Sequence, residues 1–396
     1  MGLPLEGVIV ADLTQNVAGP FCTQILGDMG ADVIKVERPG RGDDASAWAP
    51  QSWGDESATF LSMNRNKRSL ALDLKRDGGL QVLRRLIARA DVFVQSLRAG
   101  VVEELGLGFA EAVRLNPRLV YCSVTAFGSE GPLREQPGYD ALMQAYAGLM
   151  SVNGHPGQEP ARLGTSVVDM GTGMWAALGV VGALRERDAT GRPVEVTTAL
   201  FETALMWMSY HAMGYWGSGE VPQPTGSGTA MIAPYQAFPA SDGYVMIGAG
   251  SDALFARLAE ALGAPALAQD PRFADNPARV RHRVALVESL SALTRRHKAG
   301  ELVERLRGAG VPSTPILTLD AVLDEPQTRA SGMVVAGRHP RLPEYRSVGL
   351  PVRWNGRRPE VRRAPPALAE HSTDVLTWLG YTLDDVRGLR AQGVIG

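Results

Sequence analysis

The N-terminal third of the chain alternates short apolar runs with amphipathic stretches. Residues 8–12 read Val-Ile-Val-Ala-Asp, a β-branched run typical of a buried strand. A turn at residues 16–20 places Pro20 in the first turn of a helix, and residues 31–37 form a second strand-like run. This pattern is one βαβ unit, which predicts parallel strands joined by a right-handed crossover.

The same alternation continues along the chain. Strand-like runs lie at residues 69–74, 91–95 and 119–125, and an amphipathic helix is predicted at 79–90. Repetition of this kind predicts an α/β protein with a doubly wound, Rossmann-like parallel sheet. Mainly helical patterns follow.

A second unit begins after a stretch rich in Gly, Ser, Pro and Thr at residues 217–228, which marks a linker or loop. It contains a strand at 243–248 and helices at 252–263 and 282–307. The segment from about residue 330 is too apolar for a disordered tail. We therefore expect it to pack back on the first domain.

The composition of the chain argues against several classes of function and of site. The 396 residues carry a formal net charge of −2, which provides no field for nucleic acid or an anionic membrane. With two cysteines, Cys22 and Cys122, and six scattered histidines, we expect neither a disulfide framework nor a metal site. The apolar helix at residues 170–184 is too short for a membrane span. These features favour a reducing cytoplasm.

Asp169 is the candidate with the clearest chemistry. It stands directly before Gly171, Gly173 and a long apolar helix. A carboxylate there meets the positive end of the helix, stays ionised and remains accessible, which suits a nucleophile. Helix capping is the structural alternative, and it is compatible with function because backbone N–H groups stabilise the charged form.

Three other motifs have structural alternatives. Residues 171–176 match the spacing of a dinucleotide fingerprint, but their context favours helix packing through small residues. The turn at residues 13–20 lacks the glycines of a nicotinamide site, although with Arg38 it can hold a phosphate or be a surface turn. The basic cluster at residues 64–68 is either a solvated charge run or a contact for an anionic ligand.

Ordered matches along nearly the whole chain resemble the family III CoA-transferases, which include formyl-CoA, carnitine-type and succinyl-CoA-dependent enzymes. The matching segments are residues 18–20, 26–37, 64–75, 127–132, 138–140, 242–248 and 310–312. The resemblance implies that Asp169 is the nucleophile. It also implies coenzyme A contacts at Val17, Ala18, Arg38, Leu72, Asp73, Leu74, Lys75, Ser96, Leu97, Arg98, Tyr139 and Asp140.

Four glycines are further candidates at the reacting end of the substrate. From their spacing after Asp169, backbone N–H groups near Gly171 and Gly173 are expected to stabilise the oxyanion. Gly248 and Gly250 are possible counterparts of the family's glycine-rich loops that cover the intermediate.

The resemblance also implies an architecture and a reaction. The large domain would comprise residues 1–225 and 326–396, the small α+β domain residues 226–325, and two copies would interlock as a homodimer. Coenzyme A would pass from an acyl-CoA to a carboxylic acid through aspartyl anhydride and thioester intermediates. The coenzyme is then a substrate, with no permanently bound cofactor.

Two alternatives to transfer remain at the level of sequence. Related α-methylacyl-CoA racemases carry a histidine where this chain has Tyr139, so the proton-transfer pair is missing. A non-catalytic CoA-binding protein is the other alternative. The sequence does not name the acids, although family habit favours a dicarboxylate such as succinate for one of them.

Overall fold

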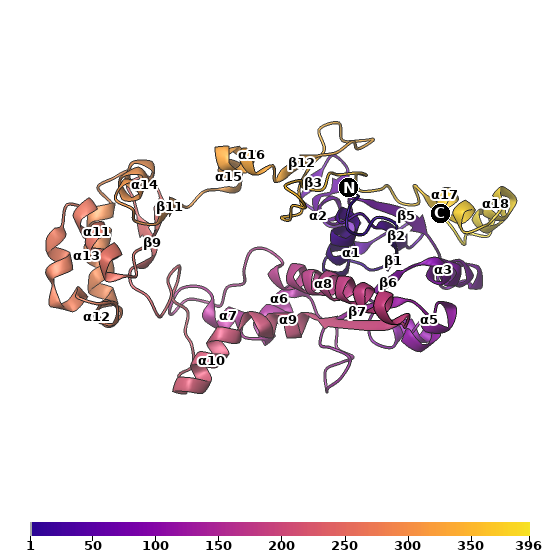
Figure 1. Ribbon diagram of the computed structural model, residues 1–396, viewed down its shortest axis with the longest axis horizontal. Coiled ribbons are helices and arrows are strands. Elements are labelled where there is room, and N and C mark those ends of the chain that lie inside the picture. Colours follow the sequence, from indigo (N-terminus) through magenta and orange to yellow (C-terminus); the bar gives the residue numbers. More distant parts are fainter. Residues whose placement is uncertain (1) are drawn as a thin grey trace. The chain divides into compact units, whose positions relative to one another are not determined.

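The computed structural model describes residues 2–396, which form two compact units (Figure 1). The first unit contains the residues up to 148 together with 163–210 and 326–396. The second contains residues 149–162 and 211–325. Each unit has its own sheet and its own core, so each is described separately.

A six-stranded parallel sheet forms the centre of the first unit. Its strand order is β5-β2-β1-β6-β7-β8. The strands are β1 (Ile9–Leu13), β2 (Asp32–Glu37), β5 (Lys67–Ala71), β6 (Val92–Gln95), β7 (Val120–Thr125) and β8 (Val194–Ala199). In chain order, β2 and β5 are added on one side of β1. The strands β6, β7 and β8 are then added on its other side. The predicted parallel α/β sheet is confirmed, with β5 two residues earlier than expected.

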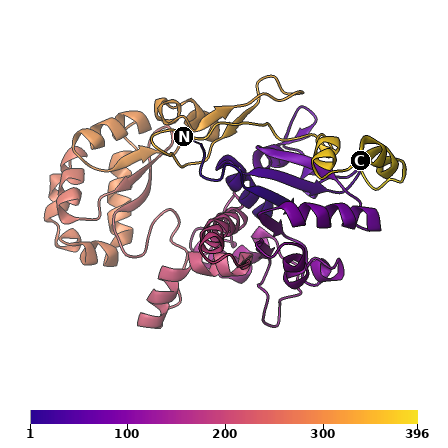
Figure 2. The ribbon, with the colours of Figure 1, turned by 45° about the vertical axis from the view of Figure 1, so that its right-hand side comes forward.

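Helices cover both faces of this sheet. One face of the sheet, which carries Ala11 and Leu13, packs against four helices. They are α3 (Asp77–Arg89), α5 (Phe109–Leu115), α17 (Ser372–Trp378) and α18 (Leu383–Ala391). The opposite face contacts α1 (Ala18–Asp28) and α8 (Val167–Thr190). Both views show the C-terminal helices, in yellow, beside the N-terminal strands (Figures 1 and 2).

The C-terminal segment joins the first unit directly, as expected from its apolar character. The N–H of Asp73 donates to the carbonyl of Val394 at 2.9 Å, and Leu72 forms a β-bridge with Ile395. The last residues therefore extend the structure beyond the end of β5.

Helix α8 is longer than the sequence indicated. It runs over 24 residues, so the expectation that it is too short to cross a membrane was wrong. Among residues 2–396 it is the one helix long and apolar enough for a span, and half of its apolar stretch is buried. It packs against α1, β7 and β8, which is the placement of a core helix.

Two glycines allow α8 to approach its neighbours closely. A Cβ on Gly173 would lie 2.5 Å from the carbonyl oxygen of Ala18, and one on Gly171 would lie 2.7 Å from the Trp207 ring. The glycine pattern of residues 171–176 therefore serves helix packing, as the structural interpretation predicted.

The second unit is built on a three-stranded antiparallel sheet. Its order is β11 (Ser313–Pro315), β10 (Tyr244–Gly248), β9 (Tyr235–Pro239). The surrounding helices are α11 (Asp252–Ala261), α12 (Asn276–Arg281), α13 (Arg283–Thr294) and α14 (Ala299–Gly308). The single helix predicted at 282–307 is two helices, α13 and α14. Asp242 accepts the N–H of Ala299, the first residue of α14, at 2.7 Å.

The remaining elements are short. They are η1 (Asp44–Ala47), β3 (Ser52–Trp53), β4 (Glu56–Ser57), α2 (Ala58–Met63), α4 (Val101–Glu104), α6 (Asp140–Tyr146), α7 (Leu149–Val152), α9 (Leu200–Trp207), α10 (Ser209–Ser218), η2 (Pro265–Gln269), η3 (Pro271–Phe273), α15 (Leu319–Asp324), α16 (Pro326–Ser331), β12 (Val334–Ala336) and β13 (Arg346–Val348).

The same substitution at two glycines of α8 should have opposite effects. Gly173→Ala forces α1 and α8 apart and should lower the free energy of unfolding by about 1–3 kcal/mol. No atom lies within 4 Å of a Cβ at Gly182, so Gly182→Ala should raise it by about 0.5–1 kcal/mol through helix propensity. Urea unfolding of both variants measures the difference. Equal effects would contradict the packing role of Gly173.

Candidate active site

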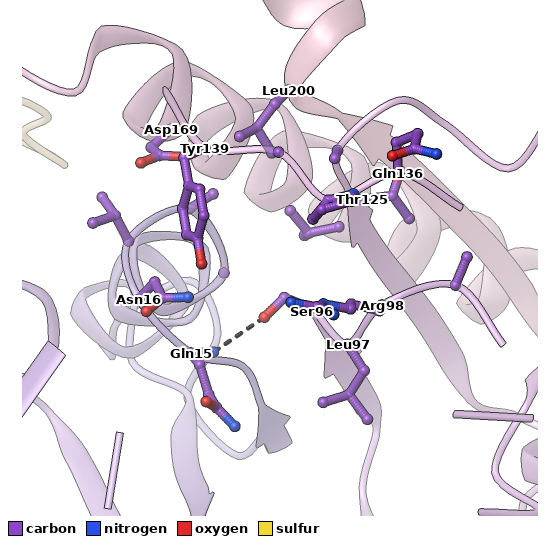
Figure 3. Close-up of a pocket in the computed structure, with 18 of the residues that line it drawn as sticks. Gln15, Asn16, Ser96, Leu97, Arg98, Thr125, Gln136, Tyr139, Asp169 and Leu200 are labelled. Carbon is purple, nitrogen blue, oxygen red and sulfur yellow. Dashed lines mark hydrogen bonds between the residues drawn. The ribbon is translucent and has the colours of Figure 1, made fainter. Parts of the chain in front are cut away.

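A pocket opens where the order of the sheet reverses. In doubly wound sheets, ligands bind outside the carboxyl ends of the strands at such a point. Here the segments 15–19 and 96–99 follow β1 and β6, and Thr125 ends β7. The Gln15 N–H donates to Ser96 Oγ at 3.1 Å and ties the first two segments together (Figure 3).

The pocket joins residues from several elements. They are Gln15, Asn16, Val17, Ala18, Gly19, Trp48, Ser96, Leu97, Arg98, Ala99, Val124, Thr125, Ala126, Arg134, Glu135, Gln136, Pro137, Gly138, Tyr139, Asp169 and Leu200.

Asp169 lies in the first turn of α8, half-buried, beside Tyr139 (Figure 3). Burial, and then the nearby Asp140 carboxylate, raise the pKa of Asp169 from 3.8 to about 7. The expectation that the helix terminus keeps this group firmly ionised was therefore wrong. An acid with this pKa is a more basic nucleophile than an ordinary aspartate once it has lost its proton.

Asp140, not Asp169, caps α8. Its Oδ2 accepts the N–H of Val168 at 2.8 Å and that of Asp169 at 3.1 Å, while Ser166 at the N-cap position makes no side-chain cap. Its Oδ1 accepts a hydrogen bond from Gln144 Nε2 at 2.5 Å. Asp140 is 5% exposed and does not line the pocket. The structure thus gives it a part in placing Asp169, and its expected contact with coenzyme A stays a prediction.

Gly171 and Gly173 lie inside α8, and this position does not support their assignment to an oxyanion site. Only the N–H groups before the first completed turn of a helix lack intrahelical partners. The Met170 N–H already donates to the carbonyl of Ser166 at 2.9 Å, so the later N–H groups of Gly171 and Gly173 are used within α8.

Gly248 and Gly250 belong to the second unit. Gly248 ends β10, and a Cβ there would lie 3.3 Å from the Tyr235 ring. A Cβ on Gly250 would lie 2.3 Å from Ile232. Their absence of a side chain therefore fits local packing in that unit.

The pocket brings together half of the positions expected to contact coenzyme A. Together with Asp169 it is lined by Val17, Ala18, Ser96, Leu97, Arg98 and Tyr139.

The other expected contacts follow β2 and β5, along the same carboxyl edge of the sheet. Arg38 donates to Gln15 Oε1 at 3.3 Å and to Asp44 Oδ1 at 2.5 Å, so it lies one residue from the pocket. The segment 72–75 follows β5, where Leu72 is buried and Lys75 is exposed. Leu74 packs on the core and Asp73 pairs with Arg76 at 3.1 Å.

The basic cluster at residues 64–68 is neither a solvated charge run nor a contact for an anionic ligand. Arg65 pairs with Asp28 at 2.6 Å, and Lys67 pairs with Asp12 at 3.1 Å, both almost completely buried. Burial lowers the pKa of Lys67 to about 8, against the attraction of Asp12. The acids that neutralise this cluster lie far away in the sequence, so no local signal could reveal them.

Several pocket residues were not singled out from the sequence. Gln15 and Asn16 lie in the turn at 13–20 that was considered as a phosphate site. Thr125 ends a predicted strand, so the rule for carboxyl ends could have found it. Trp48 and the segment 134–137 lie in irregular structure, where no pattern marks them.

Comparison with known proteins identifies the family. The model of CoA-transferase family III matches residues 5–372. The chain belongs to this family. Human succinyl-CoA:glutarate CoA-transferase is 36% identical over 94% of this chain and 85% of its own. Succinyl-CoA–D-citramalate CoA-transferase of Chloroflexus aurantiacus is 35% identical over 99% and 98%.

A solved structure agrees with this assignment. A CaiB/BaiF family protein from Brucella suis is 36% identical, with a TM-score of 0.88 over 96% of this chain and all of that one. The predicted family and the class of enzyme, a family III CoA-transferase acting on CoA thioesters, are thus confirmed.

The raised pKa of Asp169 should appear in the stability of the protein. Because the folded chain raises this pKa from 3.8 to about 7, folding disfavours the ionised form and loses stability as pH rises between those values. Asp169→Asn removes the ionisation. The variant should be more stable than the wild type by roughly 1–4 kcal/mol at pH 8, and the gain should vanish near pH 4. Urea unfolding at several pH values measures it.

Asp55→Asn is the control, because Asp55 is an exposed aspartate of the same unit. Its unfolding free energy should follow that of the wild type at every pH. A gain for Asp169→Asn that does not depend on pH would contradict the shift in pKa.

Proposed function

We propose that this enzyme moves coenzyme A from an acyl-CoA donor to a carboxylic acid acceptor with Asp169 as the nucleophile. The observation that carries the proposal is the place of this carboxyl group. It is half-buried, faces the pocket at the switch point of the sheet, and has a pKa raised to about 7.

In the first half of the reaction, the Asp169 carboxylate attacks the thioester carbonyl. A C–O bond forms, the C–S bond breaks, and coenzyme A leaves as a thiolate. The thiolate then attacks the Asp169 carbonyl of the mixed anhydride and releases the donor acid. Asp169 is left as a thioester of coenzyme A.

In the second half, the acceptor carboxylate attacks the carbonyl of the Asp169 thioester. A C–O bond forms, the C–S bond breaks, and an anhydride and the coenzyme A thiolate result. The thiolate attacks the acceptor's carbonyl, which gives the new acyl-CoA and frees the Asp169 carboxylate. At every stage one carboxyl group, of the donor, of Asp169 or of the acceptor, is held as a thioester or an anhydride, so no ATP is needed.

The surroundings of Asp169 favour its acylation. Both intermediates are neutral at Asp169, so their formation removes a charge that burial and Asp140 disfavour. The same two effects that raise the pKa of this group therefore also stabilise the acylated enzyme relative to the free carboxylate.

The carboxyl edge of the sheet is suited to the long, anionic coenzyme. Arg38, Lys75 and Arg98 follow β2, β5 and β6 and supply positive charge for its phosphates. Binding of this remote part would orient the thioester at Asp169 and help to exclude water from the intermediates.

Dicarboxylic acids are the proposed substrates. The names of the relatives include succinate, glutarate, D-citramalate, oxalate and mesaconate as acids or acyl groups. Succinyl-CoA is therefore the first donor to test, with the other acids as acceptors.

Replacing Asp169 should abolish transfer. Asp169→Ala should lower kcat by at least about a thousandfold with succinyl-CoA and any acceptor that the wild type uses, because nucleophile and intermediate are both lost. Acyl-CoA formation is followed by chromatography. Hydroxylamine treatment of the wild type with donor should mark the peptide that contains Asp169.

Asp55→Ala, an exposed aspartate outside the pocket, should transfer at the wild-type rate. A label on another residue, or full turnover of Asp169→Ala, would refute the mechanism. Deuterium uptake at the α-carbon of an acyl-CoA without any acceptor would instead indicate a racemase.

We also propose that the enzyme is a homodimer, in which the copies interlock as the family resemblance implies. The support is an exposed apolar surface on the first unit. Met174 and Leu178 of α8 and Leu205 and Met206 of α9 are each at least half exposed. The two helices pack against each other, and exposed apolar side chains gathered on neighbouring elements usually mark an interface.

Charges in this surface should weaken the dimer. Leu178→Glu with Met206→Glu should shift the mass measured by light scattering from two chains towards one, because each carboxylate would lose its water in the interface. Leu383→Glu, at an equally exposed leucine of α18, is the matched control and should stay dimeric. A monomeric wild type would overturn the proposal.

A further inference from the structure

A single buried carboxylate joins two walls of the pocket. Asp43 Oδ1 accepts the N–H of Asn16 at 3.0 Å and the N–H of Ala45 at 2.9 Å. Its Oδ2 accepts a hydrogen bond from Lys35 Nζ at 2.8 Å. Asp43 is 1% exposed, and Lys35 is completely buried.

The first wall is the turn after β1. Asn16 has a φ of 68°, in the left-handed region that side chains seldom adopt. Such a conformation persists where the surrounding structure holds it, and such residues cluster at functional sites. Here the hydrogen bond to Asp43 holds the backbone of Asn16, and the segment 15–19 that contains it lines the pocket.

The second wall is the segment that carries Trp48. Asp43 is the N-cap of η1 (Asp44–Ala47), through its bond to the Ala45 N–H. Trp48 follows directly and its N–H donates to the carbonyl of Ala45 at 3.3 Å. Asp43 therefore fixes both the Asn16 turn and the start of the Trp48 segment, although it does not line the pocket itself.

Lys35, the ion-pair partner of Asp43, also holds the turn after β1. Its ammonium also donates to the carbonyl of Thr14 at 2.9 Å, at the beginning of the same turn. Burial alone would lower the pKa of Lys35, but the attraction of Asp43 and its other acidic neighbours outweighs burial and raises it. Lys35 therefore stays charged beside Asp43.

The use of lysine here is specific. Only four of the 40 basic residues in the chain are lysines, and two of them, Lys35 and Lys67, are completely buried behind this turn. An ammonium is compact and can donate in three directions, whereas a guanidinium is planar and larger. The small enclosed site between Thr14 and Asp43 therefore suits the ammonium group of lysine.

We propose that the Lys35–Asp43 ion pair is a positioning device for the pocket, which holds the Asn16 turn and the Trp48 segment at the separation needed to seat the thioester end of acyl-CoA. This proposal rests on the proposed function in one respect: it takes this pocket as the site that binds acyl-CoA. Neither residue touches the substrate. A buried ion pair is a poor source of stability, since apolar residues of similar volume often replace one without loss, so placement of the two walls is the role that the contacts support.

The test separates positioning from stability. Asp43→Ala removes the acceptor for both walls and should lower kcat/KM for acyl-CoA by about 10–100-fold, chiefly through KM, as small displacements of binding groups do. Asp43→Ala leaves the buried ammonium of Lys35 without its partner and can destabilise the fold. A double variant, Lys35→Met with Asp43→Leu, is therefore made in parallel. This double variant removes both charges, should remain folded by circular dichroism, and should show the same loss.

Asp28→Asn is the matched control. It breaks the buried pair with Arg65 in the same unit, away from the pocket, and should lower the melting temperature without changing KM.

Asp43→Asn keeps an oxygen that can accept the two N–H groups and should recover part of the lost kcat/KM.

A folded double variant with the wild-type KM would overturn the positioning role, as would a rise in KM for Asp28→Asn equal to that for Asp43→Ala. Asp169→Ala is assayed beside them, so full activity there counts against the proposed mechanism alone. Titration calorimetry with acetyl-CoA supplies a readout that does not need turnover. The double variant should bind at least about tenfold more weakly than the wild type.

Discussion

Asp140 accepts the N–H groups of Val168 and Asp169, and these two hydrogen bonds decide what Asp169 can do. They satisfy two of the N–H groups at the start of α8 that have no partner within the helix. They also place a second negative charge beside it, which together with burial raises its pKa to about 7. Asp169 therefore does not cap the helix, because another carboxylate performs the capping, and its carboxyl group is left for the reaction that we propose.

The reversal of strand order at β1 gives this carboxyl group its surroundings. The segments that follow β1 and β6 diverge at the reversal and leave the pocket between them. Behind the turn after β1, Lys35 and Lys67 hold the buried acids Asp43 and Asp12. The α1 face of the sheet thus contains charged groups as well as apolar ones, and these charges fix the backbone that forms one wall.

Most elements of the first unit could be predicted from the sequence. The strands and α1 follow from β-branched runs and from turn residues, because a strand covered on both faces must be apolar along its length. Two errors concern element boundaries: β5 begins earlier than its apolar run, and α13 and α14 are separate helices, with the start of α14 bonded to Asp242 of another segment. The position of Asp169 was likewise predictable, since it precedes a clear helical pattern.

The sequence by itself determined the parallel α/β unit, the start of the long helix near Asp169 and the family, because these depend on periodicity and ordered local motifs. Only the tertiary structure decided that Asp140 caps that helix, that Gly171 and Gly173 serve packing, and that the basic cluster is buried. Each of these depends on a partner distant in the chain. Hydrogen bonds, burial and charge act through space, so the pKa of Asp169 could be inferred only after the fold had brought Asp140 beside it.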